Sequence, residues 1–148
     1  MILRRKHDNK KMTTAILCNS NIITSKQIQD ALNSEQNKFC RFDEYYITQF
    51  PWDAAEHIAK EKCDFLFIDE ITESNRELEP ILMRIRRNNE NIKIVLFTSY
   101  VSDLTRKMMV EHTIDTYILM PFQASHIIHA LADITCAEEG NNEEMIEI

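Results

Sequence analysis

Hydrophobic and polar residues follow two patterns along this chain, and both patterns are confined to about residues 13–136. Continuous apolar runs of about four to eight residues are typical of strands that are buried on both faces of a sheet. Four such runs occur, at 14–18, 65–68, 92–97 and 116–119. Between the first two, residues 39–42 form a candidate edge strand, which residues 45–47 either extend or follow as an irregular loop before Pro51.

Helical patterns separate these runs. In the first helix Thr24 is a good N-cap, Gln27 completes a capping box with it, and Ile23 can form a hydrophobic staple with Ile28. Ser102 is a good cap for a later helix. The apolar residues of the last helix have a spacing that indicates one buried stripe: Ile127, Ile128, Leu131 and Ile134.

Two helices in the middle of the chain are harder to place. A helix at about 53–60 is expected to turn four side chains inward: Trp52, Ala55, Ile58 and Ala59. The next helix has two possible starts, because Ser74 and Glu77 form a capping box whereas Pro80 prefers a first helical turn. We expect an irregular turn followed by helix at about 78–87.

Five β/α units in succession predict an α/β fold, a doubly wound, flavodoxin-like, five-stranded parallel sheet with strand order 2-1-3-4-5. We expect one domain at 13–136, with a basic flexible tail at 1–12 and an acidic tail or truncated linker at 137–148.

Composition narrows the function. The formal net charge is −7, with a surplus of positive charge in residues 1–11 and five glutamates in residues 138–148. An acidic domain is not expected to bind nucleic acid. No apolar run approaches the length of a membrane span, and the amino terminus lacks a secretory signal, so we expect a cytoplasmic protein without a membrane partner. The cysteines show no paired spacing, which favours free thiols: Cys18, Cys40, Cys63 and Cys136.

The scarcity of glycine excludes several classes of enzyme. The only glycine is Gly140, in the acidic tail. Dinucleotide-binding loops, P-loops and the G-x-S-x-G turn of hydrolases all need glycines at fixed places. We therefore expect no enzymatic activity.

Polar residues follow the predicted strands at the edge of the sheet where ligands gather in open α/β folds. They are Asn19, Ser20 and Asn21 after the first strand, Asp69 and Glu70 after the third, and Thr98 and Ser99 after the fourth. Met120 and Pro121 follow the fifth strand.

Three segments resemble the receiver domain of two-component response regulators, the chemotaxis-type fold, over about residues 13–135. They are Phe65-Leu66-Phe67-Ile68-Asp69, Ile94-Val95-Leu96-Phe97-Thr98 and Asp115-Thr116-Tyr117-Ile118-Leu119-Met120-Pro121-Phe122. The resemblance implies that Asp69 is the phospho-acceptor, Thr98 the switch hydroxyl and Tyr117 the aromatic that rotates inward on activation. An aspartate after a strand is also a common turn residue, and Thr and Tyr are common in strands.

The chain departs from the family at two places. The family has an acidic pair after the first strand to hold Mg²⁺, where this chain has the uncharged Asn19 and Ser20. The family also has a lysine before the proline after the fifth strand, where this chain has Met120. Asp69 with a carbonyl of Asn19 is expected to bind Mg²⁺ weakly or not at all, and no other cofactor is expected. Both departures remove charge that phosphoryl transfer requires.

We therefore predict an atypical receiver that signals by protein–protein interaction with weak or no phosphorylation of Asp69. The partners implied by the resemblance are a histidine kinase, an output domain, or a second copy bound through the last two helices and the fifth strand. The alternative is a working receiver whose Asp69 is phosphorylated by a histidine kinase. More remote alternatives are a flavin protein of flavodoxin-like fold and a metal site at His126 and His129, which lack an obvious third ligand.

Overall fold

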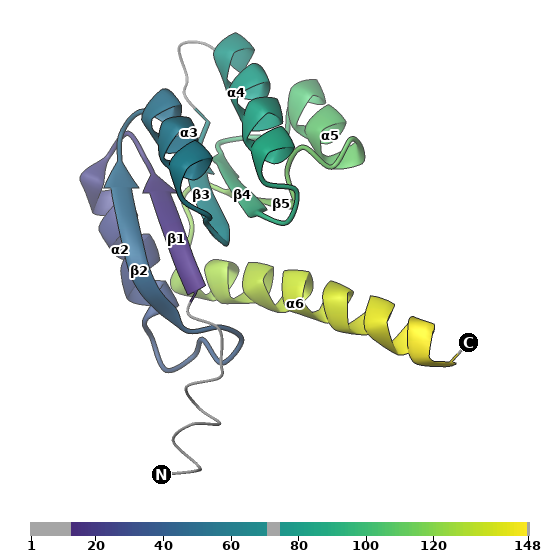
Figure 1. Cartoon of the computed structure of the whole chain (residues 1–148). Helices are drawn as coiled ribbons and strands as arrows, with labels where there is room; N and C mark the ends of the chain where they lie inside the picture. The colour runs from purple at the N-terminus through teal and green to yellow at the C-terminus, as the bar shows by residue number, and fades with distance from the viewer. Residues whose placement is uncertain (1–12, 71–74, 148) are drawn as a thin grey trace.

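The structure, a computed structural model, describes residues 13–70 and 75–147, with side-chain surroundings for 13–70 and 78–135. Strands and helices alternate throughout (Figure 1). The strands are β1 (Thr13–Cys18), β2 (Phe42–Thr48), β3 (Phe65–Asp69), β4 (Lys93–Thr98) and β5 (Thr116–Leu119). The helices are α2 (Ile22–Leu32), α3 (Pro51–Lys60), α4 (Asn75–Asn88), α5 (Asp103–Val110) and α6 (Ala124–Glu147).

The strands form one parallel sheet with the order β2-β1-β3-β4-β5, which confirms the predicted topology. The central strand β3 is buried along its whole length. A strand at this position has helices on both of its faces, so every residue of its apolar run finds a core to enter. The uncertain second strand is an edge strand at 42–48, whereas 39–41 belong to the preceding loop.

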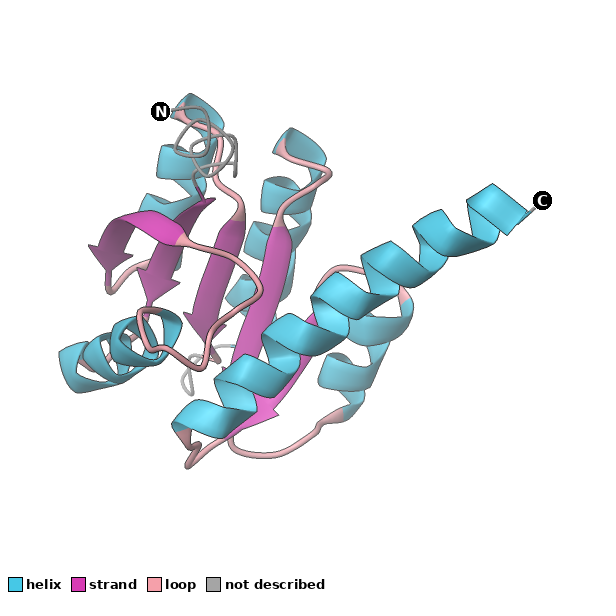
Figure 2. Cartoon of the chain, turned by 90° about the horizontal axis from the view of Figure 1, so that it is seen from below, coloured by secondary structure: helices cyan, strands magenta, loops and turns pink. Residues whose placement is uncertain are grey.

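Helices cover both faces of the sheet (Figures 1 and 2). One hydrophobic cluster lies beneath α3, α4 and α5, and includes Ala54, Leu82 and Met108. The other lies beneath α2 and α6, and includes Ile28 and Leu131. The aromatic side chains of the second cluster pack ring against ring: Phe42, Phe65, Phe67, Phe97 and Phe122.

An ion pair holds the end of α4 against the start of β5. The Nη2 atom of Arg86 lies 2.9 Å from the Oδ2 atom of Asp115, and the same oxygen accepts a hydrogen bond of 2.8 Å from the backbone N–H of Ile94. Arg86 also donates to the backbone carbonyls of Ile92 and Thr113. The pair is partly buried and fixes the turn before β5.

Two predicted helix starts were wrong. The N-cap of α2 is Asn21, whose side chain accepts a hydrogen bond from the backbone N–H of Ile23, and Thr24 lies buried inside the helix. Asparagine caps as well as threonine, and it comes first along the chain. Helix α4 begins at Asn75 with Pro80 inside it, while the alternative cap at Ser74 lies outside the described residues. A proline in the first two turns removes one backbone hydrogen bond, and burial of the apolar face of α4 offsets that loss.

The inward face of α3 also differs from expectation. Trp52 and Ala59 are exposed, and Ala54 takes the buried position beside Ala55 and Ile58. The helix begins two residues earlier than predicted, and its buried stripe follows the spacing i, i+3, i+4, i+7 from Pro51, with Trp52 and Ala59 outside it. The backbone of α6 continues to Glu147 and extends past the sheet (Figure 2). Glutamate is a good helix former. None of the helices within the described residues is long and apolar enough to cross a membrane.

Candidate functional site

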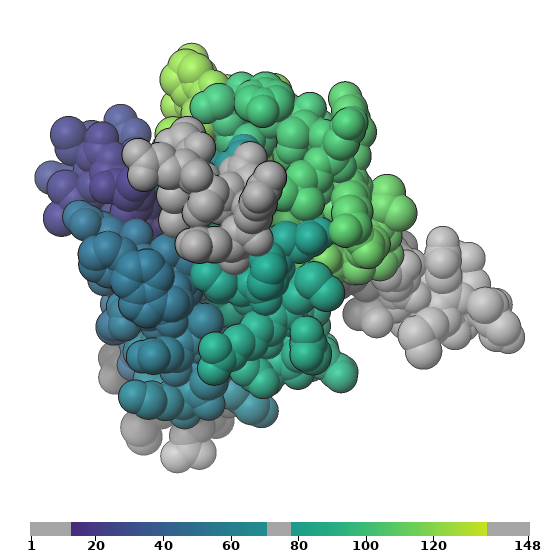
Figure 3. All heavy atoms as spheres, turned by 90° about the horizontal axis from the view of Figure 1, so that it is seen from above, coloured from purple at the N-terminus to yellow at the C-terminus, as the bar shows by residue number. Residues whose placement is uncertain are grey.

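The carboxyl ends of the strands bring the predicted polar residues to one edge of the sheet. Cys18 lies beside Ile68 in the ladder between β1 and β3, and Asp69 lies beside Phe97 in the ladder between β3 and β4. The residues that follow β1 and end β3 are therefore neighbours. Figure 3 looks onto this end of the molecule, with the start of α2 in purple and the start of α3 in blue.

Asn19, Asp69 and Ser25 form a buried chain of hydrogen bonds at this edge. The amide Nδ2 of Asn19 donates to the Oδ1 of Asp69 over 2.6 Å. The hydroxyl of Ser25 donates to the Oδ1 of Asn19 over 2.8 Å, which orients the Asn19 amide group toward Asp69. All three side chains are buried. Asn19 thus directs a hydrogen-bond donor toward the carboxylate, and its carbonyl oxygen is already occupied.

Burial raises the pKa of Asp69 above its ordinary value. The hydrogen bonds from the Asn19 side chain and from the backbone of Ser20 lower the pKa and oppose this effect in part. A carboxylate that is removed from water loses its hydration, and these donors compensate for part of the loss. Asp69 is thus a buried carboxyl group held by neutral partners.

Thr98 is engaged by a different neighbour. Its hydroxyl donates to the Oε2 of Glu70, and the Thr98 Oγ1 lies 2.9 Å from the carbonyl oxygen of Tyr100. The backbone N–H of Glu70 donates to the carbonyl of Phe97 over 2.8 Å, which keeps Glu70 beside the end of β4. The structure therefore pairs Thr98 with Glu70, whereas Asp69 is bonded to Asn19.

The two remaining predicted positions lie near β5. Met120 is half-buried against the core beneath α2 and α6, and its backbone N–H donates to the carbonyl of Thr98 over 2.9 Å. Tyr117 is half-buried against the opposite core, beneath α3, α4 and α5. The uncharged Met120 side chain stands at the end of β5, so it brings no cation to the site.

The sequence did not predict a second polar network at the end of β2. The hydroxyl of Tyr46 donates to the Oδ2 of Asp53 over 2.8 Å, and the ring of Tyr46 stacks on His57 with centroids 4.0 Å apart. Thr48 and Tyr46 lower the pKa of Asp53 through their hydrogen bonds, the bond from Thr48 having the larger effect. No sequence motif indicates this network, because its members meet only when α3 packs beside β2. The role of Ser25 was also missed, because its hydroxyl meets Asn19 only in the folded protein.

The thiols do not add chemistry to the site. Burial raises the pKa of Cys18 to about 12, with smaller contributions from the charges of Asp69 and Asp53. Cys40 and Cys63 are also free, and burial raises the pKa of each to about 11. A thiol with so high a pKa is scarcely ionised at neutral pH and is a poor nucleophile. The side chain of Cys136 lies outside the described residues.

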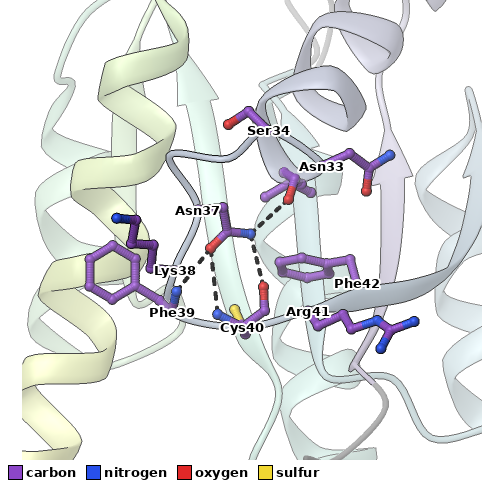
Figure 4. Close-up of a pocket in the computed structure, with 9 residues that line it drawn as sticks. Asn33, Ser34, Asn37, Lys38, Phe39, Cys40, Arg41 and Phe42 are labelled. Atoms are coloured by element: carbon purple, nitrogen blue, oxygen red, sulfur yellow. Dashed lines mark hydrogen bonds between the residues drawn. The ribbon is translucent and has the colours of Figure 1, made fainter. Parts of the chain in front are cut away.

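A pocket of about 470 Å³ lies at the loop between α2 and β2 (Figure 4). The side chain of Asn37 fills the middle of the loop and donates to the carbonyls of Leu32 and Cys40. Lys38 and Arg41 point to opposite sides of the loop, so their charges do not converge on one ligand. At the other candidate position, His126 accepts a hydrogen bond from the backbone of Gln123. Within the part of the chain that the structure describes, no three potential ligands gather to hold a metal ion.

Comparisons of the sequence identify no relative. No protein-family model matches the chain. No curated protein matches it either.

The fold, by contrast, is shared with solved receivers. A response regulator from Thermotoga maritima superposes with a TM-score of 0.70 at 21% identity, covering 85% of this chain and 99% of that one. A CheY-like receiver domain protein from Methanospirillum hungatei gives 0.71 at 14% identity, covering 88% and 99%. A response regulator from Burkholderia pseudomallei, solved with a phosphorylated aspartic acid and a calcium ion, gives 0.64 at 20% identity, covering 91% and 74%. The chain therefore has the fold of a response-regulator receiver domain.

Proposed function

We propose that this domain acts in signal transduction by binding other proteins, and that it does so without requiring phosphorylation of Asp69. The observation that carries the proposal is that the polar groups of the site are paired with one another. Asn19 donates to Asp69 over 2.6 Å, and Thr98 donates to Glu70. A phosphoryl group on Asp69 would have to break the first pair and separate the second to reach the Thr98 hydroxyl.

The residues present also fit Mg²⁺ poorly. The metal needs oxygen ligands, preferably anionic, and Asn19 directs an N–H group toward Asp69. Phosphoryl transfer depends on cations that stabilise the spread negative charge, and Met120 supplies none. These features support a protein that is not an enzyme and holds no cofactor.

Receivers generally bind kinases or output domains, or they dimerise, and we propose a surface of this kind on α5, β5 and α6. Val110 and Leu119 are exposed apolar side chains on these elements. The domain would then act in the cytoplasm, where such partners reside.

The alternative is a phospho-accepting receiver. It is favoured by the position of Asp69 at the end of the central strand, with the Thr98 hydroxyl at the end of the neighbouring strand. In that case a histidine kinase would phosphorylate Asp69.

Amide chemical shifts separate the two functions. Mg²⁺ and then beryllofluoride, a phosphoryl mimic, are titrated into isotopically labelled protein while Asp69, Thr98 and Tyr117 are observed. The proposal expects no saturable change in these amide chemical shifts at Mg²⁺ concentrations in the millimolar range. A saturable response that the Asp69→Asn variant loses would establish the phospho-accepting function instead.

A further inference from the structure

Two exposed aromatic side chains stack on each other where β2 leads into α3. The centroids of the Phe50 and Trp52 rings lie 4.7 Å apart, with 27° between the ring planes. Phe50 is 49% exposed and Trp52 is 58% exposed. Trp52 is the only tryptophan of the chain, and the apolar pattern at 52–59 predicted that its side chain is buried. Aromatic side chains of this size carry much of the energy of protein interfaces when a partner covers them.

Two exposed isoleucines stand at the same end of the sheet as this pair. Ile22 and Ile23, at the start of α2, are 66% and 61% exposed. The backbone N–H of Asn19 donates to the carbonyl of Thr48, which ties the end of β1 to the end of β2 just before both helices begin. Figure 3 shows the two segments side by side, α2 in purple and α3 in blue. We name Ile22, Ile23, Phe50 and Trp52 the aromatic patch. An exposed apolar cluster of this kind marks an interaction surface.

The fold holds the aromatic pair in place. The backbone N–H of Phe50 donates to the hydroxyl of Thr48 over 3.2 Å. The first turn of α3 is anchored to β2 by the hydrogen bond of 2.8 Å from Tyr46 to Asp53. A surface that is rigid before binding loses little conformational entropy when a partner arrives.

The charges around the patch indicate the partner. Asp53 follows Trp52 directly, and Glu56 is exposed one turn further along α3. On the α2 side, Lys26 is the charged residue one turn from the isoleucines. Among the residues that the structure describes here, acids therefore outnumber bases, and the chain as a whole carries a net charge of −7. A cation placed over the face of a tryptophan ring gains further attraction.

We propose that the aromatic patch binds a basic amphipathic helix of a partner protein. Leucine-like side chains at i and i+4 of that helix would meet the isoleucine pair and the aromatic pair, and its Lys or Arg residues would face Asp53 and Glu56. A second copy of this chain would bring acids against acids, and an anionic membrane would be repelled by the same groups. The inference rests on the protein-binding part of the proposed function, and it gives the domain a second surface beside the one on α5, β5 and α6.

Tryptophan fluorescence, excited at wavelengths that tyrosine does not absorb, tests the inference, because Trp52 is then the source of the emission. The probe is a synthetic helix of about 18 leucine and lysine residues in an amphipathic pattern, without tryptophan. It is expected to shift the emission to shorter wavelength in a saturable way. A control peptide in which glutamate replaces every lysine is expected to leave the emission unchanged.

Two matched variants locate the binding. Phe39 is 39% exposed just before β2, at the opposite end of that strand from Phe50, so Phe39→Ser serves as the control for Phe50→Ser. We expect Phe50→Ser to weaken binding about tenfold or more and Phe39→Ser to change it by less than about twofold. Circular dichroism of each variant shows that it is folded. Glu56→Gln should weaken binding of the basic peptide, whereas Glu90→Gln, in the exposed turn between α4 and β4, should not.

Each other outcome overturns the inference. Equal losses in the Phe50→Ser and Phe39→Ser variants would mean nonspecific attraction, and equal binding of the glutamate peptide would refute the role of charge. A blue shift that grows with protein concentration alone identifies self-association, and a shift on vesicles of phosphatidylcholine and phosphatidylglycerol identifies a membrane surface. The beryllofluoride titration tests the role of Asp69 separately. Absence of peptide binding would therefore not contradict phosphate-independent signalling, and phosphorylation of Asp69 would not contradict peptide binding at the patch.

Discussion

The buried bond between Asn19 and Asp69 provides a sharp test of how the site is built. Replacing Asn19 with alanine removes the donor that lies 2.6 Å from the Asp69 carboxylate and leaves the hydroxyl of Ser25 without its acceptor. A hydrogen bond to a charged group contributes about 1.5–3 kcal/mol, and a neutral one contributes about 0.5–1.5 kcal/mol. We therefore expect Asn19→Ala to lower the free energy of unfolding by about 2–4 kcal/mol.

A double-mutant cycle isolates the bond itself. Urea denaturation at neutral pH gives the free energies of unfolding of the wild type, Asn19→Ala, Asp69→Ala and the double variant. The coupling energy between the two positions should be about 1.5–3 kcal/mol. At acid pH Asp69 becomes neutral, and the coupling should fall toward about 1 kcal/mol. A coupling near zero at neutral pH would show that the two side chains do not share this bond, and the argument for an internally paired site would fail.

Three further substitutions have clear expected outcomes. Asn19→Asp places a second carboxylate beside Asp69, so it should destabilise the fold at neutral pH and make the stability rise with added Mg²⁺. Denaturation with and without the metal measures this, and a variant whose stability does not change with Mg²⁺ would contradict it. Burial raises the pKa of Asp69 above 3.8, so the folded state holds the carboxyl proton at higher pH than the unfolded state does. The wild type should therefore lose stability relative to Asp69→Asn as the pH rises through that raised pKa. A difference in stability between the two proteins that does not change with pH would contradict this. Asp115→Ala removes the partner of Arg86 and the acceptor of the Ile94 N–H, and thermal unfolding should show a loss of about 3 kcal/mol, whereas a loss below about 1 kcal/mol would mean that the pair is screened by water.

Most of the fold could be predicted from the sequence because its strands are continuous apolar runs. A run such as 65–68 has no polar side to expose, so it is stable only between two layers of helices, and that requirement leads to a doubly wound parallel sheet. The candidate site followed from the same logic, since the carboxyl ends of parallel strands share one edge. Asn19, Asp69 and Thr98 were therefore expected near one another without any contact being known.

The errors arose where a local pattern allowed two outcomes. Thr24 and Asn21 are both good N-caps, and only the path of the chain out of β1 decided that Asn21 starts the helix. Trp52 was expected just before the helix, but it lies inside α3. At about 100° per residue it points away from the buried stripe that begins at the preceding Pro51.

The sequence by itself determined the sheet, its order and the loss of charge at the ends of β1 and β5, because residue type and hydrophobic period are local properties. Only the tertiary structure decided which polar groups pair, since the partners of Asn19, Thr98 and Asp53 come from other elements. The tertiary structure also decided that Phe50 and Trp52 are exposed and stack on each other. A side chain's surroundings depend on how helices rotate and pack against the sheet, and that rotation is set by many contacts at once rather than by the residue itself.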